Sequence, residues 1–230
     1  MSNNNNNRGN MTRKRTALKS LKRKDTVGII LLGDVEVGKS ALIRRWMNDE
    51  FPAEYNATVE DFFMKTVVSL NQRVNVTIVD IAGGRQFPSM DDLYMKKSEV
   101  VMLVYETGNE KSIKSLKRYY NCACETMKER KVNYVVVATK HDLHESDTSL
   151  MKPIDEINDL FEGLLDPPAQ FQTSAKTGDN VSELFEHAIK EVVKRNSVHD
   201  RRSKFEKQIT IEQMEDEKET NDRKCGCTLL

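Results

Sequence analysis

The chain has 230 residues, of which 38% are hydrophobic and 31% charged, and its 36 basic and 36 acidic side chains cancel to a formal net charge of zero. This composition fits one domain with tails, or two small domains, and argues against a membrane-spanning protein, since no apolar run reaches the roughly 18–20 residues that a span needs. No apolar secretory signal opens the chain and its four cysteines do not suggest a disulfide framework, so we expect a reduced, cytosolic protein.

A basic N-terminal arm is expected over residues 1–25. No acidic residue precedes Asp25, and the run NNNNN has nothing to bury, so we expect this arm to be disordered. Two interpretations are equally open at this point: a solubilising or nuclear-targeting arm, and one that is attracted to an anionic surface. The basic residues are Arg8, Arg13, Lys14, Arg15, Lys19, Lys22, Arg23 and Lys24.

Strand and helix patterns alternate over residues 26–195. Continuous apolar runs such as TVGIILLG and NYVVVAT predict strands covered on both faces. MKTVVSL and RVNVTIVD, separated by Asn71 and Gln72, predict an antiparallel hairpin. The expected fold class is therefore α/β, with a mostly parallel six-stranded sheet, helices on both faces and one antiparallel strand. We predict strands at 26–33, 64–70, 73–80, 100–106, 133–139 and 169–173, and helices at 39–51, 112–129, about 153–165 and 181 to about 195.

The stretch GDVEVGKS, Gly33 to Ser40, joins the first predicted strand to the first predicted helix. Glycines let backbone N–H groups surround an anion, and the helix N-terminus adds its dipole. Lys39 would reach the terminal phosphates of a nucleotide, and the Ser40 hydroxyl would bind Mg²⁺. An ordinary glycine-rich turn is the alternative, but the position between a strand and a helix favours a P-loop.

Further motifs indicate which nucleotide binds. TKHD at 139–142 and TSAK at 173–176 each follow a predicted strand, and EYNATVEDFF at 54–63 and DIAGG at 80–84 precede them. Together with the phosphate loop, these motifs resemble the Ras superfamily of small GTPases over residues 26–195. The resemblance implies a P-loop G domain that binds GTP or GDP with Mg²⁺.

The resemblance also assigns roles by position. Asp142 would accept hydrogen bonds from the guanine base, Lys140 and Phe51 would pack near it, and the Ala175 backbone N–H would meet its oxygen. Ser40, Thr58 and Asp80 would hold Mg²⁺, and the catalytic positions would be Gly83, Gly84 and Thr58. The implied nucleotide-binding residues are Gly33, Val35, Glu36, Val37, Gly38, Lys39, Ser40, Ala41, Phe51, Tyr55, Thr58, Gly83, Thr139, Lys140, Asp142, Ser174, Ala175 and Lys176.

Three features depart from the family pattern. Gly84 stands where the family carries the glutamine that orients the attacking water, and Gln86 comes two positions too late to replace it. Val35 would crowd the space of that glutamine and of an activator's arginine finger, while Glu36 is expected to point to solvent. Thr139 replaces an asparagine, leaving one donor instead of two between the base loop and the phosphate loop, which predicts lower affinity and faster exchange.

These departures leave two classes of function. The favoured one is a slow GTPase that stays GTP-loaded and binds effector proteins through residues 53–63 and 81–97, with an exchange factor as a further candidate partner. The alternative is a catalytically inactive or nearly nucleotide-free interaction module. An ATPase is disfavoured by Asp142 followed by TSAK, and nothing indicates nucleic-acid binding. ATVEDFF resembles the Ras branch, and RQFPSM, at 85–90, resembles the group that includes Dexras and Rhes.

Residues 196–230 form a charged tail that ends in CGCTLL. Cys227 fits a C-a-a-X motif whose final leucine favours geranylgeranylation. One prenyl chain binds membranes only marginally, so a second signal is expected, either a modified Cys225 or the basic arm. We therefore expect anchoring at the cytoplasmic face of a membrane, the plasma membrane above all. Cys122 and Cys124 fall on opposite sides of a predicted helix and are not expected to bind metal.

Overall fold

The computed structural model describes residues 26–51, 58, 60–83, 89–128, 130–143, 157–159, 161–162 and 167–198. The chain divides into two compact units, Met1–Val192 and Val193–Leu230. In the second unit, the described residues 193–198 are helical. The expected boundary between G domain and tail, near residue 195, stays a prediction.

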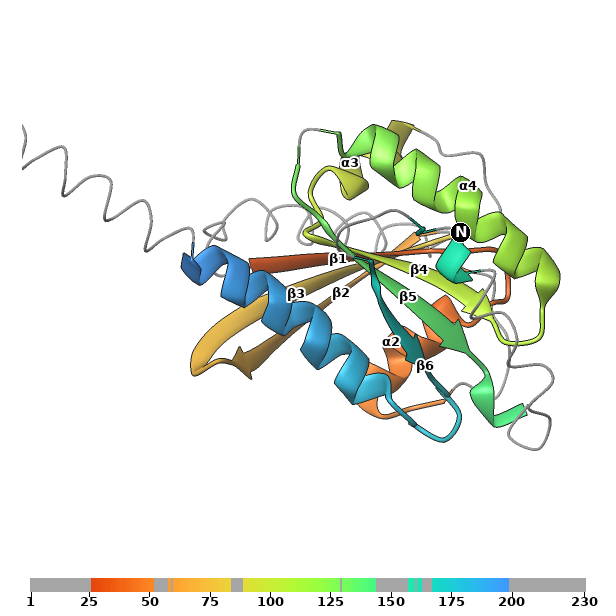
Figure 1. The fold of residues 1–230 in the computed structure, drawn as a ribbon. Helices are drawn as coiled ribbons and strands as arrows, with labels where there is room; N and C mark the ends of the chain where they lie inside the picture. The colour runs from red at the N-terminus through yellow and green to blue at the C-terminus, as the bar shows by residue number, and fades with distance from the viewer. Residues whose placement is uncertain are drawn as a thin grey trace, which may run out of the picture. The chain divides into compact units, whose positions relative to one another are not determined.

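The first unit is built on a six-stranded sheet with the order β2-β3-β1-β4-β5-β6 (Figure 1). Every neighbouring pair is parallel except β2 and β3, which are antiparallel. The predicted α/β fold, with a mostly parallel six-stranded sheet and one antiparallel strand, is confirmed. The strands are β1 (Thr26–Leu32), β2 (Glu60–Ser69), β3 (Gln72–Ile81), β4 (Val100–Glu106), β5 (Asn133–Thr139) and β6 (Ala169–Gln172).

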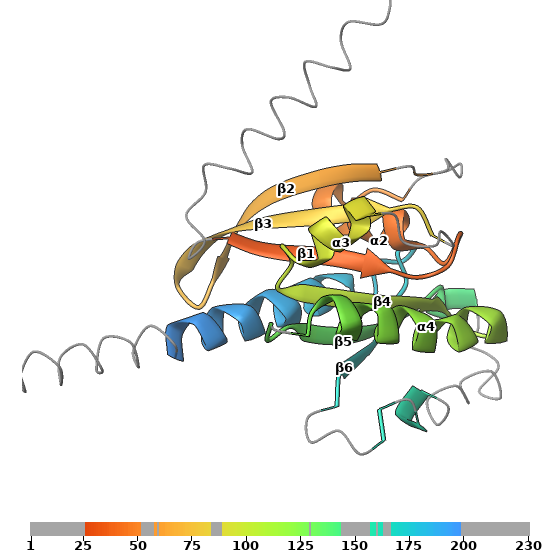
Figure 2. The same ribbon diagram turned by 90° about the horizontal axis from the view of Figure 1, so that it is seen from above.

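Helices cover both faces of this sheet, as predicted. Figure 2 shows α3 (Ser89–Met95) and α4 (Glu110–Thr126) on one face, and α2 (Lys39–Asn48) with the helix of residues 181–192 on the other. Leu116 of α4 packs with Ile30 and Leu103 in one buried cluster. Because side chains alternate along a strand, Ile29 faces the opposite layer and is equally buried. Buried side chains on both sides explain why β1 and β4 read as continuous apolar runs.

Several boundaries differ from the predicted ones. β2 begins at Glu60, four residues earlier than expected, because Phe62 already packs against Tyr94 of α3. The hairpin turn is Leu70–Asn71 rather than Asn71–Gln72, since both of these residues have positive φ, as a two-residue type I′ turn requires.

The helices differ as well. α4 begins at Glu110, two residues early, because the Asn109 side chain accepts a hydrogen bond from the Ser112 backbone N–H and so caps it. α3 was not predicted. Of the helix expected at about 153–165, only residues 157–159 are seen as helical, and most of that range lies outside the described residues. Within the described part of the chain, no helix combines the length and the apolar character needed to cross a bilayer.

Candidate functional site

The loop between β1 and α2 is shaped to surround an anion. At Gly33 an added Cβ would lie 2.2 Å from the backbone oxygen of Val104, so the position admits only glycine. Glu36 and Gly38 have φ values of 64° and 96°, and successive turns of this kind form backbone N–H concavities that bind anions. The Glu36 side chain is exposed, as expected from the sequence.

Lys39, the first residue of α2, is the buried cation of this loop. Its Nζ donates to the backbone oxygens of Gly33, at 2.9 Å, and Asp34, at 2.7 Å. Burial lowers the pKa of Lys39 to about 8, although the carboxylates of Asp80 and Asp34 oppose this shift. Phosphates in the loop would raise this pKa again and so favour the charged ammonium, which means that the site suits a polyanion.

The three predicted Mg²⁺ ligands come together beside Lys39. Ser40 Oγ and Thr58 Oγ1 lie 2.8 Å apart and share a hydrogen bond. Asp80 is 1% exposed, and its Oδ1 atom has no hydrogen-bond partner among the described residues. Burial raises the pKa of Asp80, against the opposing effects of a hydrogen bond from Ser40 and the charge of Lys39. An unpartnered carboxylate oxygen next to two hydroxyls is a donor set that fits a hard cation such as Mg²⁺.

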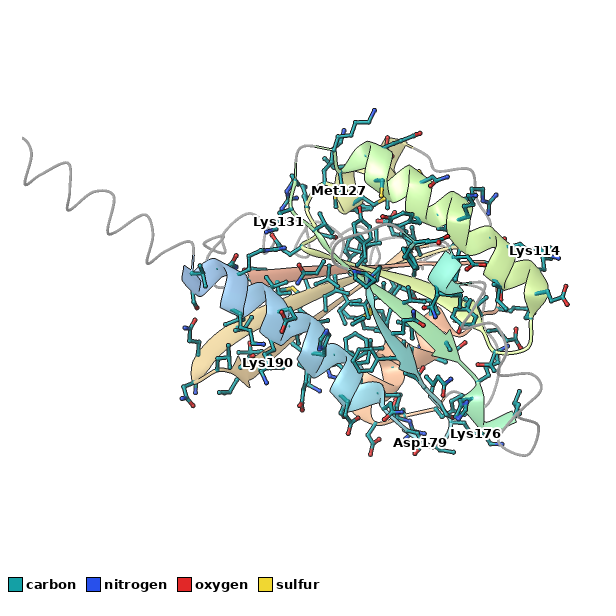
Figure 3. All side chains as sticks on the ribbon, viewed as in Figure 1. Lys114, Met127, Lys131, Lys176, Asp179 and Lys190 are labelled. Atoms are coloured by element: carbon teal, nitrogen blue, oxygen red, sulfur yellow. The ribbon has the colours of Figure 1, made fainter. Side chains whose placement is uncertain are left out.

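The motifs predicted to bind the base meet at the carboxyl ends of β5 and β6. Asp142 lies in the short 3₁₀ helix η2 (His141–Leu143), and Ser174 Oγ donates to its Oδ1 at 2.7 Å. Lys176 Nζ lies 4.0 Å from the other carboxylate oxygen. Figure 3 shows Lys176 and Asp179 in the loop from β6 to the helix of residues 181–192. The structure therefore brings the TKHD and TSAK motifs together.

Lys140 is held in place by a partner that the sequence did not indicate. Its backbone has a φ of 58°, and its Nζ forms an ion pair with Glu106 Oε1 at 2.9 Å. Asn109 Nδ2 donates to the other oxygen of Glu106 at 3.2 Å. The pair joins the end of β4 to the start of the base loop.

Thr139 connects the base loop to the phosphate loop although it replaces the family's asparagine. It is 2% exposed, and its Oγ1 lies 2.5 Å from the Val37 backbone oxygen and 2.9 Å from that of Tyr105. A hydroxyl has one proton, so it donates to one of these two carbonyls at a time. The connection is thus kept, with half the donors that an amide would offer.

The other predicted site residues are placed as follows. An added Cβ on Gly83 would lie 2.4 Å from the backbone oxygen of Asp34, so this turn lies directly against the phosphate loop. Phe51, predicted to pack near the base, is exposed and lies beyond α2, which ends at Asn48. Tyr55, Gly84, Gln86, Cys225 and Cys227 lie outside the described residues.

Two further groups of contacts, one at Asp34 and one at Arg45, hold the site and were not predicted. Asp34, inside the phosphate loop, accepts a hydrogen bond from Tyr119 Oη at 2.9 Å, and Arg118 Nη2 lies 3.5 Å from the same oxygen. Arg45 of α2 donates to backbone oxygens of the TSAK segment. A carboxylate in an anion-binding loop needs a hydrogen-bonding or cationic partner, so the sequence could have indicated that Asp34 has one. The position of Arg45 depends on tertiary packing and has no local signal.

The parallel sheet, the phosphate loop that leads into α2, and the buried Lys39 beside Ser40 and Asp80 define a P-loop nucleotide-binding domain. At its other end the TKHD and TSAK motifs, which resemble those of the Ras superfamily, meet at the bond between Ser174 and Asp142.

Comparisons with known proteins agree with a P-loop nucleotide-binding domain. A family model described as the Ras family matches residues 28–194. The Ypt/Rab-type GTPase YPT7 of Saccharomyces cerevisiae is 29% identical over 185 residues, which are 77% of this chain and 86% of the yeast protein. The Ras and EF-hand domain-containing protein homolog of Mus musculus is 32% identical over 181 residues, which are 76% of this chain and 28% of the mouse protein. The chain belongs to the Ras family, and this membership implies a GTP-binding switch that uses GTP, GDP and Mg²⁺.

Proposed function

We propose that the protein is a Ras-like switch whose off-reaction is weakened, so that it stays mostly GTP-bound and available to effectors. The observation that carries this proposal is the pair formed by Val35 and the Gly83 turn. Val35 is 52% exposed on the phosphate loop, and a Cβ added to Gly83 would lie 2.5 Å from the Val35 backbone nitrogen. The residue after Gly83 in the chain is Gly84, which has no side chain to orient a water molecule.

Loss of the water-positioning side chain lowers the rate of GTP hydrolysis more than it lowers the affinity for the nucleotide. The glutamine of Ras-type enzymes orients the attacking water, and an activator's arginine finger adds about 10³- to 10⁵-fold. In this proposal the branched and exposed Val35 side chain crowds the space that such a finger would need. Hydrolysis is therefore slow both with and without an activator.

Nucleotide binding is retained in this proposal. Lys39 would neutralise the terminal phosphates, and Ser40, Thr58 and Asp80 would hold Mg²⁺, which supplies further charge neutralisation when bound. Asp142 would accept from the guanine base, whose edge differs from that of adenine.

The two segments proposed to bind effectors are connected in the described residues. Tyr94 Oη, in α3, donates to Glu60 Oε1 at the start of β2 at 2.7 Å. The rings of Phe62 and Tyr94 also meet edge to face with centroids 5.1 Å apart. These contacts join the segment 53–63 to the segment 81–97, which supports one continuous effector surface.

A membrane anchor completes the proposal. Cys227 in its C-a-a-X motif would carry a prenyl chain, and Cys225 or the basic arm would supply the second signal that stable anchoring needs. Each Lys or Arg near an anionic leaflet contributes about 1 kcal/mol, so the arm favours the cytoplasmic face of the plasma membrane. ATVEDFF supports the Ras branch, while the Rab-type yeast relative makes a Rab-type role the competing assignment.

Single-turnover hydrolysis of preloaded GTP tests the proposal. We expect the wild-type rate to lie below the roughly 10⁻⁴ s⁻¹ of intrinsic Ras hydrolysis. The double variant Val35→Gly, Gly84→Gln should be faster by up to about 10²-fold, the order of effect that positioning has, and Val35→Gly alone serves as the control. A wild-type rate equal to that of the double variant would contradict the proposal. Failure to load any nucleotide would favour the interaction module instead.

A further inference from the structure

We propose that Arg45 is a positioning residue for the base-recognition loop, residues 173–176, and that it determines how slowly guanine nucleotide leaves. The proposal rests on the nucleotide-binding part of the proposed function. Arg45 does not reach the base in this role and acts through the backbone of the loop.

All three nitrogens of the Arg45 guanidinium donate hydrogen bonds. Its Nε donates to the Ala175 backbone oxygen at 2.6 Å, and its Nη2 donates to that of Lys176 at 2.7 Å. Nη1 donates to both the backbone oxygen and Oδ1 of Asp49 at 3.0 Å. The Arg45 side chain is 17% exposed and that of Asp49 is 92% exposed. Solvent therefore screens the partly buried bond to Ala175 less than it screens the pair with Asp49.

The two bonded carbonyls belong to the segment that recognises the base. Ala175 carries the backbone N–H expected to meet the guanine oxygen, and Ser174 orients Asp142 through its hydroxyl. Within the loop, the Gly178 backbone N–H donates to the Ser174 backbone oxygen at 2.8 Å and closes a turn. The Ala175 N–H shares its planar peptide unit with the Ser174 oxygen. The two carbonyls that Arg45 holds belong to the next two units along the chain, so holding them restricts the rotation of these units and thereby steadies the Ala175 N–H.

The position of Arg45 on α2 links the base-recognition loop to the phosphate end of the site. The same ten-residue helix begins with Lys39 and Ser40, which serve the phosphate end of the site, and Arg45 lies in its last turn. A helix of this length spans about 15 Å and is rigid. One helix thus fixes the separation between the phosphate end and the base end. A lysine would not replace the planar fork, because it offers a point charge.

Release of fluorescent GDP from the full chain, with and without EDTA, tests this role. Arg45→Gln should accelerate release by about 5- to 150-fold, the usual range for coupling between sites, and Arg45→Lys should lie between it and wild type. Asp49→Asn is the matched control, since it removes only an exposed helix pair and should change the rate by no more than about twofold.

The EDTA arm separates positioning from a general loosening of α2. If Arg45 acts only at the base end, EDTA accelerates release by the same factor in wild type and in Arg45→Gln, because independent effects multiply. A smaller EDTA factor in the variant would overturn the inference, since the helix that carries Ser40 would then be disturbed. Should Arg45→Gln not fold, Arg45→Lys carries the same test.

The two proposals can fail separately. Wild-type protein that binds no GDP would remove the proposed function and this inference together. Wild-type protein that binds GDP, with Arg45→Gln releasing it at the wild-type rate, would overturn the role of Arg45 alone.

Discussion

Thr139 offers the sharpest test of how the base loop is joined to the phosphate loop. Its single hydroxyl proton serves the carbonyl oxygens of Val37 and Tyr105, both within 2.9 Å. Thr139→Val keeps the shape of the side chain and removes that donor. Thr139→Asn has a similar volume and offers two N–H donors, so the two substitutions change the hydrogen bonding in opposite directions.

The expected size of the effect follows from burial. Removing a donor from a buried acceptor costs about 1–3 kcal/mol, and for a domain of this size 1 kcal/mol corresponds to about 2–4 °C in Tm. A cost of about 2 kcal/mol for Thr139→Val therefore predicts a Tm lower by about 4–8 °C. Release of GDP should also be faster in this variant, while Thr139→Asn should release GDP more slowly than wild type.

Thermal denaturation at a fixed saturating concentration of Mg²⁺ and GDP is the assay for stability, because bound ligand adds its own stabilisation. A release experiment with fluorescent GDP accompanies it. An unchanged Tm and an unchanged release rate for Thr139→Val would refute the reasoning, and so would faster release from Thr139→Asn.

Three other substitutions test contacts around the site. Gly83→Ala places a Cβ 2.4 Å from the Asp34 backbone. In competition binding it should lower the affinity for a non-hydrolysable GTP analogue more than the affinity for GDP; an equal loss of affinity for both would contradict this. Trp46→Ala removes a half-buried ring stacked on that of Phe185 with centroids 4.5 Å apart and should lower the free energy of unfolding in urea by up to about 3 kcal/mol, and a loss below about 0.5 kcal/mol would show that the stack matters little. Tyr119→Phe removes the donor to Asp34 and should cost about 1–3 kcal/mol with faster GDP release, whereas overlapping denaturation curves would argue against that anchor.

The strands of the sheet could be predicted from the sequence because buried strands consist almost entirely of apolar residues. β1, β4 and β5 are covered on both faces and appear as unbroken apolar runs, so their predicted bounds differ from the observed ones by at most one residue. α3 has only seven residues, too few to show a helical repeat, and was not predicted. The start of β2 at Glu60 depends on the packing of Phe62 against Tyr94, which lies more than thirty residues away in the chain.

The candidate site divides in the same way. Lys39, Ser40 and Asp80 belong to short contiguous motifs, so they could be named from the sequence and are brought together in the structure. The side chains that support the loops come from distant elements. Arg45 and the TSAK segment are separated by some 130 residues, and nothing local to α2 indicates which loop the guanidinium faces.

The nucleotide carried by the purified protein tests the central proposal most directly. The protein is denatured, and the released nucleotide is separated by ion-exchange chromatography and compared with GTP and GDP standards. A weakened off-reaction predicts mostly GTP. Mostly GDP would contradict it, because Gly84 and Val35 would then allow ordinary turnover.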